Sequence, residues 1–433
     1  MTNQTAASVR VGIGLREVVE LVTGAGAAYG IVAAASPILT RLYTPADFGH
    51  FQIYVTVFSF LLIAAAWRLE VAVLLPKELR SGIAVAVLGL TAVAITSSVT
   101  AIAWAALTET GLLRGPFDVI AHYGWILPVA TAGGGATAVL MQWALREGDY
   151  RAVSIARVTQ STTIAATQVA TALVPPVAGA GLMLGDAAGR IAGSATLLVR
   201  SWRAYGELAR QVRVTELRHL LIRYWRFPVI SSGSALLNTA GNVLPTVFLA
   251  AFGPTPLGWF ALVDRLIASP IALIGQQISQ VYGAKAAKLA HDDPEGLRIL
   301  FRDLSVKLAW TGALPFGGLA LAGPWMFALV FGESWRPAGH YAQFLAVTQY
   351  IGFFVWPLMP TLNILEHQHW QLAWDIARLA LCAGLMAAAA RFGGTPLWVV
   401  AAYAAGMIVA YVSHAVLSYV AIHRRVREAM PGR

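Results

Sequence analysis

The side chains best suited to chemistry in this sequence are charged residues inside long apolar stretches. Arg68 and Glu70 form one set, and Asp264 and Arg265 form another. A charge in hydrocarbon costs at least about 2.5 kcal/mol on insertion scales, so each of these residues needs a partner or a function. A guanidinium in such a place can bind an anion, and a carboxylate can exchange a proton or a small cation.

Two further sets of intramembrane charges can neutralise themselves. Asp186 and Arg190 are four residues apart, and Asp375 and Arg378 are three apart. In a helix, residues at these spacings share one face. We therefore predict a structural ion pair at both places.

Helix geometry separates the members of the first two sets. Arg68 and Glu70 lie about 200° apart around a continuous helix, so they are predicted not to bond each other, and Asp264 and Arg265 lie about 100° apart. At least one of Asp264 and Arg265 must therefore face another helix or a wet cavity. Uncharged polar residues also gather in the second half of the chain, where they suit either hydrogen bonds between helices or a hydrated cavity. The amides among them are Asn238, Asn242, Gln276, Gln277 and Asn363.

These residues must be positioned by membrane helices. Of the 433 residues, 58% are hydrophobic and 12% are charged. A soluble domain carries about 25% charged residues, so a water-soluble globular protein is excluded. Apolar runs of about 20 residues or more predict twelve helical spans. They cover residues 15–40, 48–75, 82–107, 118–143, 152–174, 177–199, 227–252, 257–282, 304–331, 341–365, 371–391 and 395–422.

The basic residues predict the orientation of these spans. If the N-terminus is cytoplasmic, the cytoplasmic segments carry 23 Lys and Arg and the opposite loops carry four. The positive-inside rule then places both termini in the cytoplasm. The longest connector, residues 200–226, carries seven Arg among aromatic residues and divides the spans six and six. We predict an N-terminal lobe over 1–199, a basic linker over 200–226 that lies on anionic headgroups or docks a protein, and a C-terminal lobe with a short basic tail over 227–433.

A short motif occurs once in each half of the chain. Gly49 and Phe51 follow a proline turn, and Gly258 and Phe260 follow another one 209 residues later. Two six-helix halves with the same orientation are typical of transporters, in which the substrate path runs between the halves.

The same segments carry a family resemblance. Residues 39–49 (LTRLYTPADFG) and 67–76 (WRLEVAVLLP) resemble the opening of the polysaccharide transporter family (oligosaccharide flippase, Wzx-like) of the MOP superfamily. Residues 227–232, 252–260 and 329–335 fit the same family pattern, so the resemblance covers nearly the whole chain. It implies an all-α, MATE-like membrane protein of two pseudo-repeated six-helix lobes. Such a protein moves undecaprenyl-pyrophosphate-linked sugar from the inner to the outer leaflet of the bacterial plasma membrane.

The resemblance also implies roles for the intramembrane charges. A pyrophosphate needs fixed positive charge in an apolar cavity, so we predict Arg265 as its bidentate partner and Arg68 as its entry contact. Asp264 and Glu70 are predicted to couple transport to H⁺ or Na⁺, unless each pairs with an Arg on a neighbouring helix. The predicted function is alternating-access flipping of the oligosaccharide for O-antigen, capsule or exopolysaccharide assembly, with a polysaccharide polymerase as a further partner.

Other functional classes stay open at this stage. An exporter of drugs or small cations has the same fold but favours a cavity of carboxylates, and a non-transporting scaffold of the assembly machinery does not explain buried charges. An enzyme is not predicted, because the outer loops are short and the chain has neither a Walker sequence nor a Ser/His/Asp arrangement. Cys382 is the only cysteine, so a disulfide within the chain and a cysteine metal cluster are excluded. We predict no cofactor, no metal and no nucleic-acid partner.

The charge asymmetry generates a topological prediction. A phosphatase that works only outside the cytoplasm should be silent when fused after Arg427 and active when inserted at Thr255. Phosphatase activity of whole cells, normalised to the abundance of each fusion, measures this. The reverse pattern would rule out cytoplasmic termini.

Overall fold

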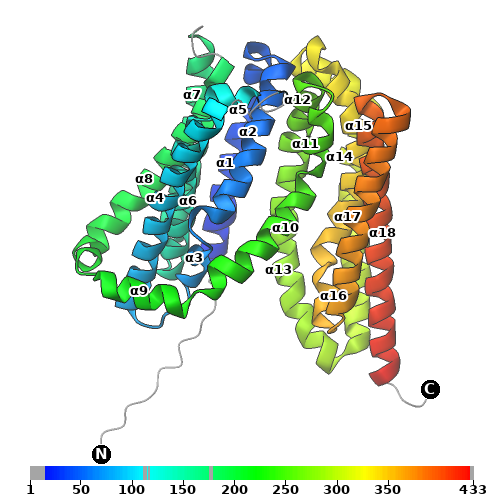
Figure 1. Ribbon diagram of the computed structural model, residues 1–433. Coiled ribbons are helices and arrows are strands. Elements are labelled where there is room, and N and C mark those ends of the chain that lie inside the picture. The colour runs from blue at the N-terminus through cyan, green and yellow to red at the C-terminus, as the bar shows by residue number, and fades with distance from the viewer. Residues whose placement is uncertain (1–14, 111–114, 116–117, 175–178, 430–433) are drawn as a thin grey trace, which may run out of the picture. The chain divides into compact units, whose positions relative to one another are not determined.

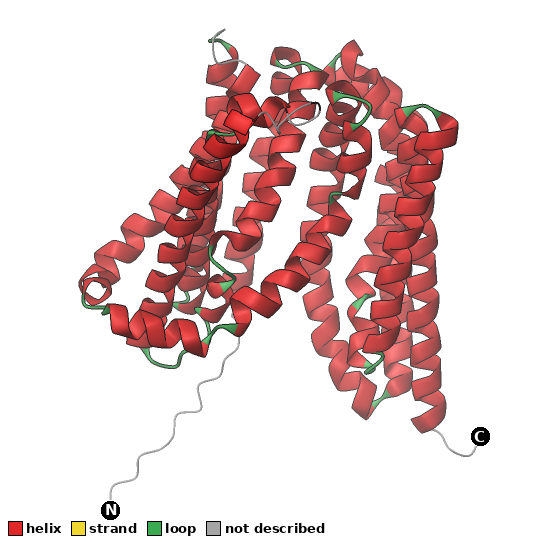
Figure 2. Cartoon of the chain, in the orientation of Figure 1, coloured by secondary structure: helices red, strands yellow, loops and turns green. Residues whose placement is uncertain are grey.

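Every regular element of the chain is a helix over the residues that the computed structural model describes, which are 15–110, 115, 118–174 and 179–429. Figure 2 shows these helices joined by short turns. The predicted all-α fold class is therefore confirmed. In a bilayer a helix satisfies all of its internal backbone N–H and C=O groups, which accounts for this uniformity.

Eight described helices are long and apolar enough to cross a membrane, and they coincide with eight of the twelve predicted spans. They cover Thr23–Leu42, Pro45–Ala65, Leu79–Thr110, Gly181–Arg210, Pro294–Phe331, Glu333–Ile364, Gln368–Phe392 and Pro396–Glu428. The other four predicted spans, 118–143, 152–174, 227–252 and 257–282, hold helices that are interrupted or more polar. The chain is a multi-pass membrane protein.

The helices form two compact units. The first contains the described residues up to 35, then 58–110 and 123–236, and the second contains residues 36–57, 118–122 and 237–429. Four helices contribute to both units: α1 (Leu15–Leu42), α2 (Pro45–Ala65), α5 (Asp118–Tyr123), of which only Tyr123 belongs to the first unit, and α10 (Ser232–Asn242).

The first unit is built on four long helices. Neighbouring pairs among them are α4 with α6, α6 with α8 and α7 with α8 (Figure 1). Its elements are α3 (Leu69–Ala72), α4 (Leu79–Thr110), α6 (Ile126–Arg146), α7 (Tyr150–Ala172), α8 (Gly181–Arg210), α9 (Val214–Arg223) and the π-helix η3 (Phe227–Ser231). Leu69, Val139 and Trp143 are buried in one of its core clusters.

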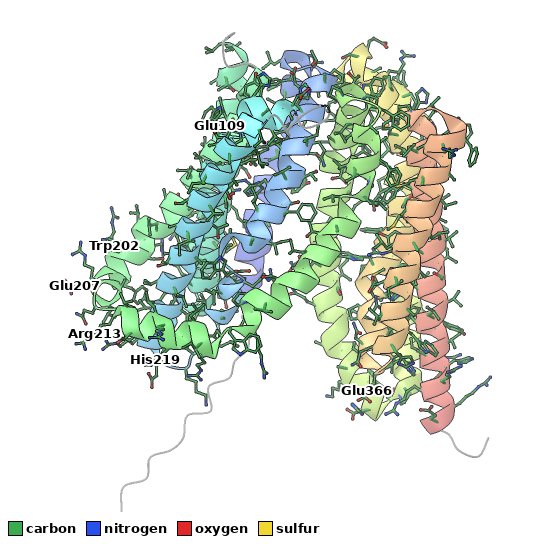
Figure 3. The ribbon with its side chains drawn as sticks, viewed as in Figure 1. Glu109, Trp202, Glu207, Arg213, His219 and Glu366 are labelled. Carbon is green, nitrogen blue, oxygen red and sulfur yellow. The ribbon has the colours of Figure 1, made fainter. Side chains whose placement is uncertain are left out.

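The basic segment 200–226 is a packed part of this unit. Its first half extends α8 as far as Arg210, and its second half is α9, whose apolar residues pack onto the core cluster of Trp143. Polar contacts hold it as well: Arg200 pairs with Asp149, the Tyr205 hydroxyl donates to Glu147 at 2.7 Å, and Arg80 pairs with Glu216 at 2.7 Å. On its outer side Trp202, Glu207, Arg213 and His219 project away from the ribbon (Figure 3).

The second unit is built on α14, α15, α17 and α18. These helices pack as the pairs α14 with α15, α15 with α18 and α17 with α18 (Figure 1). Its elements are α5 (Asp118–Tyr123), α11 (Leu244–Ala250), α12 (Pro254–Val263), η4 (Asp264–Ala268), α13 (Ser269–Asp292), α14 (Pro294–Phe331), η5 (Glu333–Trp335), α15 (Arg336–Val355), η6 (Trp356–Leu358), α16 (Pro360–Ile364), α17 (Gln368–Ala388), η7 (Ala389–Gly393) and α18 (Pro396–Ala429).

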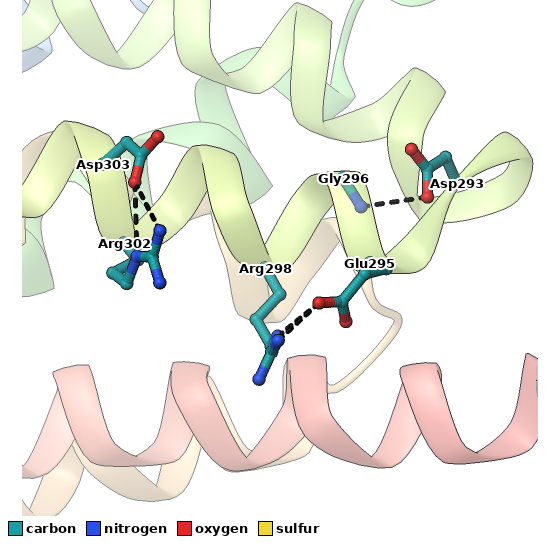
Figure 4. A network of polar contacts seen from close by, with 6 residues as sticks. All are labelled: Asp293, Glu295, Gly296, Arg298, Arg302 and Asp303. Atoms are coloured by element: carbon teal, nitrogen blue, oxygen red, sulfur yellow. Dashed lines mark hydrogen bonds and ion pairs between the residues drawn. The ribbon is translucent and has the colours of Figure 1, made fainter. Parts of the chain in front are cut away.

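Polar residues define the turn between α13 and α14. The Asp293 carboxylate caps α14 by accepting from the Gly296 N–H at 2.9 Å, and Pro294 occupies the first turn (Figure 4). Arg298 pairs with Glu295, and Arg302 pairs with Asp303 at 3.2 Å. Because neighbouring acids neutralise these arginines, this end of the helix pair is suited to water and headgroups.

The repeated proline–glycine motif forms a reciprocal contact inside the second unit. A Cβ atom on Gly49 would overlap the carbonyl of Pro254, and a Cβ atom on Gly258 would overlap the carbonyl of Pro45. The two helix starts, of α2 and α12, therefore meet backbone to backbone. Small residues allow such close helix approach in a membrane, where no hydrophobic effect drives helices together. Beside this contact Phe48 packs edge-on against buried Trp335, whose indole donates to the Thr40 carbonyl at 3.0 Å.

This contact predicts opposite effects for two glycine-to-alanine changes. Gly49→Ala should destabilise the protein by about 1–3 kcal/mol, because the new methyl group forces the two backbones apart. Gly317→Ala in α14 should be neutral or stabilising by up to about 1 kcal/mol, because Gly317 has open space around its Cα and alanine is the better helix former. Thermal unfolding of the two purified variants in one detergent measures both effects, and an equal response of the two variants would contradict the close crossing.

Candidate functional site

A break in the second predicted span presents Arg68 and Glu70. The sequence predicts one helix over 48–75, but α2 ends at Ala65 and α3 begins at Leu69. Trp67 and Arg68 between them have φ angles of 53° and 58°, in the left-handed region. That conformation costs about 1–2 kcal/mol for each residue other than glycine. The Trp67 indole holds the break in place by donating to the Thr96 hydroxyl at 3.2 Å.

Arg68 and Glu70 form an ion pair, which corrects the prediction that they do not bond each other. The Arg68 Nη1 and Glu70 Oε1 atoms are 3.2 Å apart. The prediction of 200° between the two side chains assumes a continuous helix, and the left-handed residue at Arg68 removes that assumption.

This ion pair is not saturated with hydrogen bonds. The side chains are 32% exposed for Arg68 and 13% for Glu70. Within the described part of the chain, the buried Nε of Arg68 and Oε2 of Glu70 have no hydrogen-bond partner. One donor and one acceptor are therefore buried without a partner at a strained backbone position, and such strain is concentrated at functional sites.

The chain just after the break is held by another arginine. Arg146 donates to the Val73 carbonyl at 2.7 Å and to the Glu78 carbonyl at 3.1 Å. These bonds satisfy backbone groups that the interrupted helix leaves open. The break is thus fixed on both sides by side chains of the first unit.

The two predicted structural pairs are confirmed. Asp186 accepts two hydrogen bonds from Arg190, at 2.7 and 2.9 Å, and the Arg190 guanidinium lies 3.9 Å from the centre of the Phe58 ring. Arg378 and Asp375 are 3.5 Å apart.

A cavity of about 460 Å³ lies within the second unit, beside the π-helix η4. Pro270 lies in the first turn of the helix that follows η4, and because a proline has no backbone N–H, a regular helix would lack one hydrogen bond at this point, which favours the π turn. Asp264, the first residue of η4, lines the cavity, whereas its neighbour Arg265 does not. The structure therefore places the two adjacent charges in different surroundings.

The predicted amide residues also differ in whether they line the cavity. Asn242 lines the cavity. Gln276, Gln277 and Asn363 are exposed and are not part of its lining. Asn238 belongs to α10, but its side chain is outside the described residues.

The cavity also contains functional candidates that sequence reasoning missed. Arg378 lines it, together with Gln349, Trp356, Tyr403 and Tyr411. Arg378 is missed because its spacing from Asp375 indicates a self-sufficient ion pair. The sequence does contain a relevant signal, because a guanidinium has five N–H donors and a single carboxylate does not bond all of them.

Arg378 pairs with the first member of a chain of hydrogen-bonded polar side chains. Its partner Asp375 accepts from Gln371 at 3.2 Å, and the Gln371 amide oxygen lies 2.9 Å from Nε2 of His414. Nδ1 of His414 lies 3.3 Å from the Ser418 hydroxyl, and both of these residues are buried. The described residues contain no group of three or more His, Cys, Asp or Glu that could hold a metal ion.

Comparisons with known proteins show which family and which fold this chain shares. A family model described as "Polysaccharide biosynthesis protein" matches residues 38–340. Among solved structures, the chain is similar to a multidrug resistance MATE family transporter of the MOP superfamily in an inward-facing conformation, with 16% identity, 96% of this chain and 100% of that chain covered, and a TM-score of 0.69.

Two further solved structures share the fold. The lipid II flippase MurJ in an inward closed conformation has 10% identity over 94% of this chain and 87% of that chain, with a TM-score of 0.70. A MOP superfamily transporter from Pyrococcus furiosus has 14% identity over 95% of this chain and 96% of that chain, with a TM-score of 0.58. None of the curated proteins matches the sequence. The predicted MOP fold is confirmed by these similarities.

The left-handed break predicts an unusual order of stability for substitutions at Arg68. Arg68→Gly should be about 1 kcal/mol more stable than Arg68→Ala, because glycine adopts a positive φ without strain. At Arg203, an exposed residue within α8, the order should reverse by a similar amount, about 1 kcal/mol, because alanine is favoured inside a helix. Thermal unfolding of the four variants tests this, and the same order at both positions would contradict the strained break.

Proposed function

We propose that this chain, which belongs to the polysaccharide biosynthesis protein family, is a flippase. It moves an undecaprenyl-pyrophosphate-linked oligosaccharide from the inner to the outer leaflet of the bacterial plasma membrane, for the assembly of a surface polysaccharide. The observation that carries this proposal is that a match to a polysaccharide biosynthesis family runs through a chain with the fold of MOP transporters. A lipid-linked sugar is the intermediate of such a pathway that needs a membrane transporter.

Two of the intramembrane arginines support binding of the pyrophosphate. Arg68 stands on the helix break of the first unit with a buried Nε that no described residue uses, and a guanidinium suits bidentate contacts with phosphate oxygens. Arg265 lies in the π-helix of the second unit, and π turns are frequent at functional sites. We assign Arg68 to entry of the headgroup and Arg265 to its binding during translocation.

Two carboxylates adjoin these arginines and suit coupling to a cation gradient. Glu70 pairs with Arg68, so binding of a phosphate to Arg68 competes with that ion pair. Asp264 lines the cavity of the second unit. A carboxylate that gains and loses a partner during transport can take up and release H⁺ or Na⁺, so we assign the coupling role to Glu70 and Asp264.

The outer side of the basic segment supports a cytoplasmic, lipid-facing position. Val214, Ile222 and Trp225 are at least half exposed, with 81%, 61% and 50% of each residue accessible. Arg213 and Arg223 lie between or beside them. Exposed apolar and basic residues on and beside one short helix are typical of a segment in the headgroup region of an anionic leaflet. Both termini are cytoplasmic in this arrangement.

The proposed role of Arg265 predicts a loss of transport without a loss of protein. Arg265→Ala should abolish surface polysaccharide in cells that lack the native gene and should leave lipid-linked oligosaccharide on the inner leaflet. Arg265→Lys should restore only part of it, because lysine keeps the charge and loses the planar fork.

The measurement is surface polysaccharide per molecule of inserted protein. Arg336→Ala is the matched control, because Arg336 is exposed and pairs with Glu333. Full activity of Arg265→Ala would remove Arg265 from the transport path.

A further inference from the structure

The lining of the cavity in the second unit contains both acidic and basic side chains. Its lining contains a carboxylate (Asp264), a guanidinium (Arg378), the amides of Asn242 and Gln349, and aromatic rings that include Trp356 and Tyr411. Hydrogen-bond donors and acceptors are therefore both present, next to flat apolar faces.

The volume of the cavity is much larger than a bare cation needs, so it leaves room for an organic ligand beside the cation that Asp264 is proposed to exchange. A bound metal ion fills a space comparable to one or two waters of about 30 Å³ each, whereas pockets for organic ligands span about 300–1,000 Å³. The cavity measures about 460 Å³.

The charges disfavour a simple anion. Asp264 in the lining repels one, and Arg378 already shares its charge with Asp375 at 3.5 Å. The lining suits a ligand that carries many donors and acceptors and has an apolar face for stacking. A sugar ring has these properties: its vicinal hydroxyls bond planar carboxylate, amide and guanidinium groups, and its C–H face packs on an aromatic ring.

We infer that this cavity is a subsite for the oligosaccharide part of the transported lipid, with room for roughly one or two sugar rings. Gln349, Arg378, Asp264 and the hydroxyl of Tyr411 bond sugar hydroxyl groups, and Trp356 and the tyrosine rings pack against the sugar rings. The inference deepens the proposed function and rests on it. It separates sugar recognition in the second unit from pyrophosphate binding by Arg68 and Arg265.

The surroundings of Arg378 indicate a site that is formed before the ligand binds. The chain from Asp375 through Gln371 to buried His414 fixes the carboxylate that orients the guanidinium. The Trp374 ring lies 5.1 Å from the guanidinium carbon, and its indole donates to the Ala410 carbonyl at 2.8 Å. A group positioned in this way loses little freedom when it bonds a hydroxyl.

The test separates the sugar from the pyrophosphate by using two probes on the full-length protein in nanodiscs. The first probe is radiolabelled oligosaccharide, released by mild acid from the lipid-linked fraction of cells that make the polysaccharide. The second is undecaprenyl pyrophosphate without sugar. Retention of each probe is measured over a concentration series, with and without sodium chloride at constant ionic strength.

Two variants of the cavity are compared with two matched controls. Gln349→Leu and Tyr411→Phe remove hydrogen-bonding groups from the lining, and each should weaken binding of the released oligosaccharide about tenfold while leaving undecaprenyl pyrophosphate unchanged. Gln276→Leu and Tyr350→Phe make the same changes outside the lining and should bind both probes like the wild type.

The outcomes distinguish this inference from the proposed function. If both cavity variants bind the released oligosaccharide like the wild type, or if they change only the response to sodium, the sugar subsite is overturned and the flippase function is unaffected. If the wild type binds undecaprenyl pyrophosphate and restores surface polysaccharide but retains no released oligosaccharide, the subsite is again overturned. If the wild type binds neither probe and restores no polysaccharide, the proposed function and the subsite fail together.

Discussion

The cost of an unsatisfied polar group in hydrocarbon is the constraint on which this structure depends. It makes helices the regular elements of the described chain. Wherever a helix ends, side chains must bond the backbone groups that the helix no longer satisfies. At the break around Arg68 the carbonyls of Val73 and Glu78 accept hydrogen bonds from Arg146, and Trp67 is held by Thr96. Specific side-chain contacts therefore stabilise the interruption of the helix.

The same constraint explains why the interruptions coincide with the candidate sites. A regular helix uses its backbone groups internally and leaves only side chains for binding. A left-handed residue or a π turn redirects neighbouring side chains, as at Arg68 and at Asp264. Because each redirection costs energy, it persists only where surrounding contacts enforce it. In this chain a tryptophan–threonine bond enforces the first redirection, and the proline after η4 favours the second.

Hydropathy and spacing predict much of this arrangement, and the failures have a common cause. Apolar runs locate the helices, and i,i+3 or i,i+4 spacing identifies the ion pairs of Asp186 with Arg190 and of Asp375 with Arg378, because these depend on regular local geometry. The pairing of Arg68 with Glu70 cannot be predicted in this way, since it requires the backbone to leave the helix between two residues. Arg378 is missed because its place in a cavity depends on helices distant in sequence. Local rules fail where the helix is interrupted or where tertiary packing decides.

The reciprocal crossing at Gly49 and Gly258 bears on the origin of the chain. Each glycine meets the proline that lies four residues before its counterpart in the other half, Pro254 for Gly49 and Pro45 for Gly258. Contacts in which residue i meets j while j meets i are isologous, the kind that a two-fold axis generates between identical subunits. A half-length ancestor carrying one copy of the motif would have presented the same surface to a second copy of itself. The contact therefore has the form of a homodimer interface that became internal when the gene was duplicated and fused.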